Sequence, residues 1–166
     1  AYGFLCGRDY DTRKYVRNNS SGLDLFRERR RAFAWRSPRR DRRGGTIGIP
    51  AALHLFEDLP FWRRFFHCLG FHTETSERLE EAVKKGRLLA GAEFCAPLTA
   101  LHAHERSLLD RTDYVFLPFY FERPPRDGNA RRQFCYYTQF APSLVAEAVR
   151  DEAKERVLSP LVQYLY

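Results

Sequence analysis

Residues 46–76 read "TIGIPAALHLFEDLPFWRRFFHCLGFHTETS", and this stretch decides the fold because it predicts a strand, a helix and a second strand in succession. "TIGIP" is a short apolar, β-branched run ended by Pro50, which is typical of a buried strand that leads into a helix. Pro60 lies inside the helical pattern, so we expect a kink or two helices before Gly70 ends the helical run. The apolar residues that recur there at helical spacing are Leu53, Phe56, Phe61, Phe65 and Leu69.

The rest of the sequence continues this alternation. Residues 77–86 ("ERLEEAVKKG") have acids early and lysines late, which matches the dipole of a helix closed by Gly86. A helix from about Pro97 to Asp110 precedes a strand at 113–121 ("DYVFLPFYF"), and a last helix is predicted from about Pro142 to Val157. Strands that alternate with helices of this length predict an α/β fold with an open parallel sheet.

The composition suits one globular domain in a reducing compartment. The chain has 166 residues, of which 44% are hydrophobic and 15% aromatic. Its four cysteines are unevenly spaced and form no CxxC pair, so a secreted disulfide framework is not expected and a cytoplasmic location is. No apolar run approaches the roughly 18 residues that a membrane helix needs. Because the chain begins at Ala1, contains no methionine and ends in "LSPLVQYLY", which reads as an unfinished segment, we expect a fragment of a larger protein that is cut short at the C-terminus.

The net charge of +7 is concentrated in one segment. Between Arg27 and Arg43 there are nine arginines against Glu28 and Asp41, which accounts for the whole excess. This pattern predicts a lead-in segment, residues 1–43, with an arginine-rich helix, followed by the α/β domain at 44–166. Such a segment can grip nucleic acid phosphates, but since the rest of the chain is neutral we favour a helix that docks on an acidic protein surface.

Cys95, in "EFCAPLTALHAH" (93–104), is compatible with several kinds of chemistry. A zinc site with His102 and His104 is disfavoured, because the helix places His102 about 10 Å from Cys95 along its axis. The two histidines also point to different faces, so we expect one against the sheet and the other at the surface. A cysteine before a helix start suits a thiolate nucleophile, but neither a base nor an oxyanion site is identified. A third alternative is a buried cysteine that acts as a small hydrophobe, which we favour for each cysteine taken alone.

Iron–sulfur ligation is a further alternative. In an open α/β sheet, the loops at the carboxyl ends of the strands meet at one edge. Cys95 begins a helix and Cys135 precedes another, so both could reach this edge, although two thiolates do not hold a cubane cluster. Cys68 lies on an apolar helix face near Phe65 and Leu69, so we expect it in the core.

Several segments, in order, resemble a known family. They are "IGIPAALHLFEDLPFWRRFFHCLGF", "EFCAPLTALHAH", "DYVFLP" and "FCYYTQFAP", and together they extend from about Ile47 to Pro142. They look like the uncharacterised domain attached to the ATPase modules of large CoA enzyme activases. That domain is itself similar to the dehydratase subunits of 2-hydroxyacyl-CoA dehydratases.

The resemblance implies a Rossmann-like fold and a [4Fe-4S] cluster that receives an electron from an ATP-driven activator and passes it to an acyl-CoA. Cys95 and Cys135 match cluster cysteines, while a third would lie beyond Tyr166. Cys6 resembles the last cysteine of a preceding cysteine-rich element. The chain departs from the family at Ala103, where a glycine is usual between the two histidines.

Two functional hypotheses follow from these observations. In the first, Cys95 and Cys135 are partial ligands of an electron-transfer cluster, and His102 and His104 tune or shield it. The implied partners are an ATPase activator module or a dehydratase subunit. In the second, the chain is a non-catalytic interaction domain that docks on such a partner through the aromatic residues of "DLPFWRRFF" and "FCYYTQF".

Overall fold

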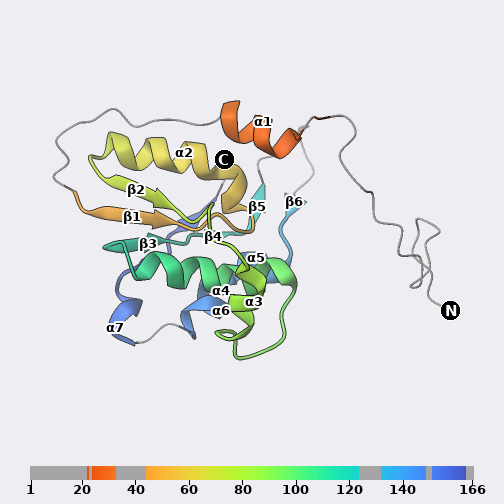
Figure 1. Ribbon diagram of the computed structural model, residues 1–166. Helices are drawn as coiled ribbons and strands as arrows, with labels where there is room; N and C mark the ends of the chain where they lie inside the picture. Colours follow the sequence, from red (N-terminus) through yellow and green to blue (C-terminus); the bar gives the residue numbers. More distant parts are fainter. Residues whose placement is uncertain (1–21, 23, 33–43, 124–131, 149–150, 164–166) are drawn as a thin grey trace. The chain divides into compact units, whose positions relative to one another are not determined.

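The computed structural model describes residues 22, 24–32, 44–123, 132–148 and 151–163 (Figure 1). The chain divides into two compact units, Ala1–Ala34 and Trp35–Tyr166. In the first unit the structure gives one helix, α1 (Leu25–Ala32), which carries four of the nine arginines. Its Arg31 forms an ion pair with Glu28 at 3.0 Å. Cys6, Trp35 and the other five arginines lie outside the described residues.

The second unit is built on a four-stranded parallel sheet. Its strands are β1 (Thr46–Ile49), β2 (His72–Thr75), β3 (Tyr114–Phe116) and β7 (Val157–Leu158), in the order β2-β1-β3-β7. β1 is central and is nearly all buried, as its short apolar sequence predicts. The predicted α/β fold with an open parallel sheet is confirmed.

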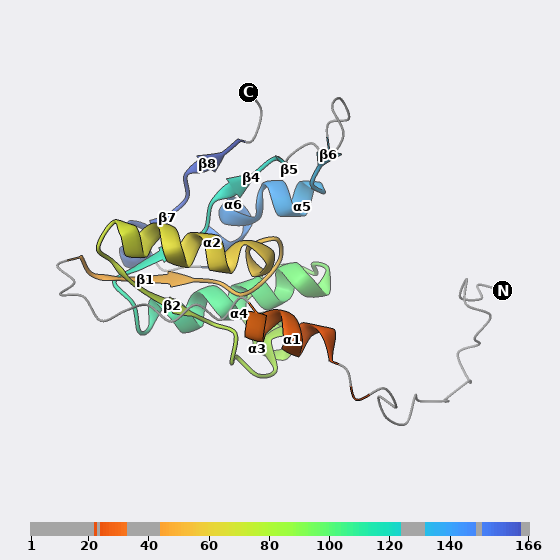
Figure 2. The same ribbon diagram turned by 90° about the horizontal axis from the view of Figure 1, so that it is seen from above.

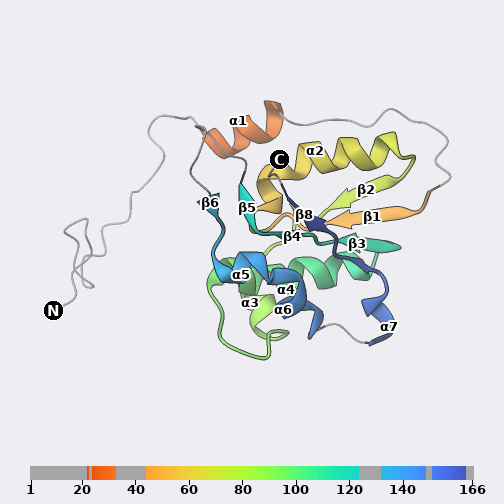
Figure 3. The ribbon, with the colours of Figure 1, turned by 180° about the vertical axis from the view of Figure 1, so that it is seen from behind.

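Helices cover both faces of this sheet (Figures 1 and 3). One face carries α2 (Leu55–Cys68), and the other carries α4 (Ala96–Leu109) with α3 (Ala82–Arg87) and α6 (Ala141–Ala146) packed beside it. β4 and β8 form a parallel pair beyond the carboxyl ends of β3 and β7 (Figure 2). The remaining elements and their bounds are β4 (Phe119–Tyr120), β5 (Glu122–Arg123), β6 (Arg132–Gln133), α5 (Tyr136–Gln139), α7 (Asp151–Lys154) and β8 (Leu161–Val162).

The helix α2 buries a different stripe from the one that the sequence suggested. It is a single helix with Pro60 inside it, and its core residues are Leu55, Leu59, Trp62 and Phe66. Trp62 Nε1 donates a 2.6 Å hydrogen bond to Tyr120 Oη, which fixes this face against the core. Phe61, Phe65, Leu69 and Cys68 are exposed instead. The prediction that Cys68 is buried was therefore wrong, because apolar residues occupy two faces of this helix and spacing alone does not decide between them.

The packing of α3 on α4 depends on Gly86. A Cβ at this position would lie 1.8 Å from the carbonyl oxygen of Thr99, so a glycine is required for the close approach of the two helices. The helix α3 starts later than predicted, after Glu81, whose φ of 53° is left-handed. Gly86 lies inside the helix rather than closing it.

Two further elements differ from the prediction. The strand expected at 113–121 is divided at Leu117–Pro118, because proline cannot donate to a sheet hydrogen bond. The helix expected from Pro142 to Val157 is divided into α6 and α7, and Val157 belongs to β7. The Arg156 guanidinium donates to the carbonyl oxygens of Leu109, Thr112 and Asp113, which ties the start of β7 to the end of α4.

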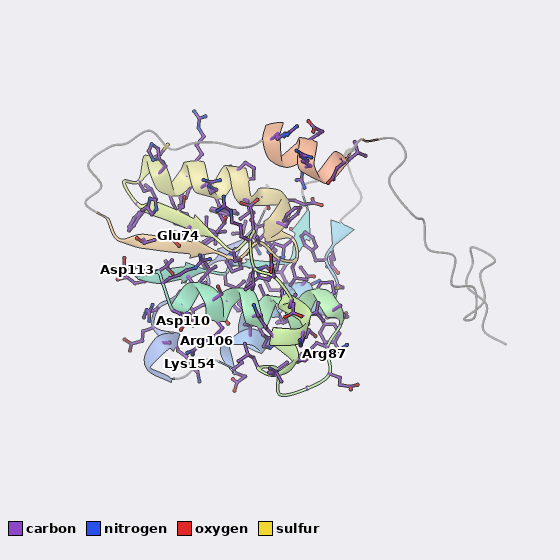
Figure 4. All side chains as sticks on the ribbon, in the orientation of Figure 1. Glu74, Arg87, Arg106, Asp110, Asp113 and Lys154 are labelled. Atoms are coloured by element: carbon purple, nitrogen blue, oxygen red, sulfur yellow. The ribbon has the colours of Figure 1, made fainter. Side chains whose placement is uncertain are left out.

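Polar contacts hold the start of β1 and the end of α4 against neighbouring segments. The Asp113 carboxylate accepts a 2.6 Å hydrogen bond from the Thr46 amide. Arg106 pairs with Asp110 at 3.2 Å, and Arg111 contacts Glu74 at 3.6 Å. Asp113, Glu74, Arg106 and Asp110 are labelled in Figure 4. These ion pairs are exposed, so each contributes little to stability.

Candidate functional site

A cleft of about 440 Å³ lies at the carboxyl end of β1. One wall is the loop that connects β1 to α2, and the other is formed by the starts of α4 and α5. The carboxyl edge of a parallel sheet is the usual place for a ligand in this class of fold. Its lining residues are Ala51, Ala52, Leu53, His54, Phe56, Glu57, Pro97, Phe134 and Thr138.

Cys95 and Cys135 are close in sequence to residues that line this cleft, although neither cysteine is itself a lining residue. Cys95 immediately precedes α4, two residues before Pro97, and Cys135 immediately precedes α5, between Phe134 and the rest of the helix. The Phe94 and Tyr137 rings meet edge to face with their centroids 5.8 Å apart, so the two cysteine-bearing segments are neighbours. Both thiols are exposed, and the view that each cysteine is a small buried hydrophobe is wrong for Cys68, Cys95 and Cys135.

Cys135 has a specific partner that favours its thiolate. Its Sγ lies 3.3 Å from Thr138 Oγ1. A hydroxyl that donates to sulfur stabilises the negative charge, and this hydrogen bond lowers the pKa of the Cys135 thiol below its usual value. Thr138 thus contributes both to the wall of the cleft and to the ionisation of the thiol beside it.

These two thiols agree with iron–sulfur chemistry in donor type but not in number. Exposed thiolates are the usual ligands of such clusters, and a Cys₄ set is the common arrangement. Within the described ranges, no group of three or more His, Cys, Asp or Glu side chains is placed to hold a metal ion. Cys95 and Cys135 alone are therefore too few for the usual ligand set.

Both histidines of α4 are buried, which corrects the expectation that one would reach the surface. The His102 ring stacks on Phe94 at 5.7 Å, and its Nδ1 lies 2.9 Å from the carbonyl oxygen of Leu98 one turn earlier. His104 Nδ1 lies 2.7 Å from Ser76 Oγ. Neither histidine is a lining residue of the cleft. α3 and α6 pack beside α4, so much more of its surface is buried than a helix with one free face would show.

Three polar residues near the sheet were not identified from the sequence. His54 is buried and lines the cleft, and the centroid of its ring lies 4.2 Å from that of Tyr120. Ser76 follows β2 and is almost completely buried. Glu105 is 1% exposed, and burial raises the pKa of its carboxyl to about 8. The only available signal was the position of Ser76 after a predicted strand, because burial of His54 and Glu105 depends on tertiary packing.

Within the described residues, no helix is long and apolar enough to cross a membrane.

Comparison with known proteins identifies the family. A search of curated proteins and a search of solved structures gave no match. Residues 46–165 match the family described as "CoA enzyme activase uncharacterised domain". This match spans the whole sheet and both walls of the cleft, and the chain therefore belongs to this family of CoA enzyme activase domains.

Proposed function

We propose that the chain is the part of a CoA-dehydratase activase-related protein that binds one side of a [4Fe-4S] cluster. The observation that carries the proposal is the pair of exposed cysteines, Cys95 and Cys135, on neighbouring segments that also carry lining residues of the cleft. When bound, such a cluster would supply one-electron transfer for the dehydration of a 2-hydroxyacyl-CoA. The other ligands would come from the rest of the natural protein or from a partner subunit.

The walls of the cleft support a role in holding an acyl group. Alanine, leucine, phenylalanine and proline side chains line most of it, and His54 and Glu57 are the ionisable residues among its lining. An apolar pocket with a few polar groups is typical of sites for small organic ligands. We therefore assign the acyl portion of an acyl-CoA to this cleft, with an ATPase activator module as the electron donor.

The histidines act indirectly in this proposal. His102 supports the ring of Phe94, the residue before Cys95, and so stabilises the position of that thiol. His104 lies behind the opposite wall, against Ser76. Each would tune or shield the site without touching the ligand, as residues outside a metal's own ligands commonly do.

The test is anaerobic purification of the full-length natural protein, with iron and sulfide assays and a visible absorption spectrum. We expect iron with matching sulfide, lost in Cys95→Ser and in Cys135→Ser. Cys68→Ser is the matched control, because this exposed cysteine lies at the end of α2 and should leave the iron content unchanged. A colourless wild-type protein, or equal iron in all three variants, would contradict the cluster.

A second candidate function is docking on an ATPase or dehydratase partner. It is favoured by the exposed aromatic residues of α2 and α5, where Phe61 is 60% and Tyr136 is 78% exposed. Large exposed apolar side chains commonly mark interaction surfaces. On this view, Cys95→Ser leaves binding of the partner intact in a pull-down, whereas the double change Phe61→Ser and Phe65→Ser weakens it. Loss of binding in Cys95→Ser would exclude a pure docking role.

A further inference from the structure

We infer that Ser76 and His104 hold the loop between β1 and α2 in the shape that forms one wall of the cleft. They are thus positioning residues of the site, although neither lines it. The inference rests on the proposed function only in treating the cleft as the binding site. The hydrogen bonds that carry it can be tested whether or not a cluster is bound.

The contact runs from the loop through Ser76 to α4. The Ala51 amide donates a 2.9 Å hydrogen bond to Ser76 Oγ, and the same oxygen lies 2.7 Å from His104 Nδ1. Ser76 is 1% exposed and His104 is 8% exposed. The hydroxyl therefore joins three elements behind the cleft: the β1–α2 loop, the end of β2 and the middle of α4.

The contact between Ser76 and His104 can form in either tautomer of a neutral His104 ring. Ser76 Oγ already accepts the Ala51 hydrogen, and its own hydroxyl hydrogen remains to be donated. Burial lowers the pKa of His104 and so favours the neutral ring. The neutral ring can accept the Ser76 hydroxyl hydrogen at Nδ1, or donate from Nδ1 to the second lone pair of Ser76 Oγ. Either arrangement joins His104 to Ser76.

The loop has a conformation that needs such support. Leu53 has a φ of 49°, in the left-handed region that side chains with a Cβ rarely adopt. The surrounding structure must hold a residue in this region. Ala51 and Leu53 both line the cleft, so the same hydrogen bond that restrains Ala51 also shapes the wall beside the strained residue.

His102 provides a matched control. It is also buried on α4, but the hydrogen bond from its ring goes to Leu98 of the same helix. Changing His102 removes a buried imidazole without cutting the link to the loop. A general loss of helix stability would therefore affect both histidine positions, whereas release of the loop would follow only from His104 and Ser76.

The experiment measures hydrogen exchange of the Ala51 amide by NMR in the full chain, at a pH where His104 is neutral. In Ser76→Ala we expect this exchange to accelerate by about fivefold to tenfold relative to amides of β1, as for the loss of one net hydrogen bond. His104→Leu should accelerate it as well. His104→Asn should stay near wild type, because the asparagine amide can donate to or accept from Ser76 Oγ in place of Nδ1, and His102→Leu should leave the ratio unchanged.

Equal Ala51 exchange in wild type, Ser76→Ala and His104→Leu would overturn the inference. If Ser76→Ala does not fold, the comparison of His104→Leu with His104→Asn decides, and equal acceleration in both would exclude a positioning role for His104. In the full-length natural protein reconstituted with ferrous iron and sulfide, Ser76→Ala should change the visible spectrum at unchanged iron content. If the wild type takes up no iron, the proposed function fails while the exchange result still decides this inference.

Discussion

The helices α2 and α4 cover opposite faces of the same sheet but differ in what they bury. α2 buries an aliphatic and aromatic stripe and leaves Phe61 and Phe65 exposed. α4 is covered by the sheet on one side and by α3 and α6 beside it, and it buries His102, His104 and Glu105. A helix between two layers must accommodate polar groups internally, whereas a helix with one free face can expose even its aromatic residues.

The consequence is that the two helices depend on different interactions. Stability at α2 comes from apolar packing and the hydrogen bond from Trp62 to Tyr120. At α4, stability depends on the protonation of His104 and Glu105 and on the fit of the neighbouring helices. Within α4 the adjacent residues His104 and Glu105 differ again, since His104 contacts Ser76. Glu105 Oε1 has no hydrogen-bond partner among the described residues.

The largest effect is expected for Trp62→Ala in α2. The change removes a buried indole and leaves the Tyr120 hydroxyl without its bond to Nε1, so the free energy of unfolding should fall by about 3–5 kcal/mol. Phe61→Ala is the matched control, because Phe61 is the exposed neighbour on the same helix and its loss should stay within about 0.5 kcal/mol. Urea denaturation measures both, and equal losses would contradict the assignment of the buried face.

The next effect is the pH dependence that Glu105 gives to α4. The pKa of its carboxyl is about 8 in the folded state against an ordinary value of 4.5, so the folded protein keeps a proton that the unfolded chain releases. Stability should therefore fall as the pH rises from about 4.5 to about 8, by a few kcal/mol in order of magnitude, and then level off. Glu105→Gln should remove this fall in denaturation curves measured at pH 5 and pH 8.

His104 makes stability depend on pH in the opposite direction, so the Glu105 variant is needed to separate the two contributions. Burial lowers the pKa of His104 below 6.5, so its contribution to stability is present above that pH and is lost as the pH falls through its folded-state value. Subtracting the Glu105→Gln curve from the wild-type curve isolates the carboxyl. Glu80→Gln serves as a control for an exposed carboxylate. A wild type that is as stable at pH 8 as at pH 5, relative to Glu105→Gln, would contradict a buried neutral Glu105.

The contrast between α2 and α4 also shows which parts of the fold could be predicted from the sequence. The strand residues of "TIGI" and the helix start at Cys95–Pro97 carry local signals, so the parallel sheet and α4 were predicted closely. In α2 the apolar residues lie on two faces, and local spacing could not select the buried one. The short pieces after Pro118 and Pro142 depend on pairing with distant residues, such as the β4–β8 contact.

The residues of the candidate site likewise fall into those that the sequence could predict and those that it could not. Cys95 and Cys135 could be predicted as neighbours of one edge, because strand ends in a parallel sheet meet there. The hydrogen bond from Ala51 to Ser76 joins residues 25 positions apart, and the contact from Ser76 to His104 spans 28. Such pairs carry no local pattern, so a single sequence does not reveal them. Their effect on the wall of the cleft could be seen only in the structure.

The smallest of the three effects tests the fit of α3 against α4. Gly86→Ala would place a Cβ 1.8 Å from the carbonyl oxygen of Thr99, a backbone atom that cannot move aside without displacing α4. We expect a loss of about 1–3 kcal/mol in the free energy of unfolding, as for other overpacked interiors. Gly91→Ala is the matched control, since nothing lies within 4 Å of its added Cβ, and it should change the denaturation midpoint little.

This substitution also links packing to the site. Thr99 lies one turn from Cys95, whose carbonyl accepts the Thr99 amide at 2.9 Å, so a shift of Thr99 displaces the start of α4. We therefore expect Gly86→Ala to change the reaction rate of the Cys95 thiol with a disulfide reagent while that of Cys68 stays constant. If both the stability and the Cys95 rate matched the Gly91→Ala control, the close approach of α3 to α4 would be wrong, and burial of α4 on that side would need another explanation.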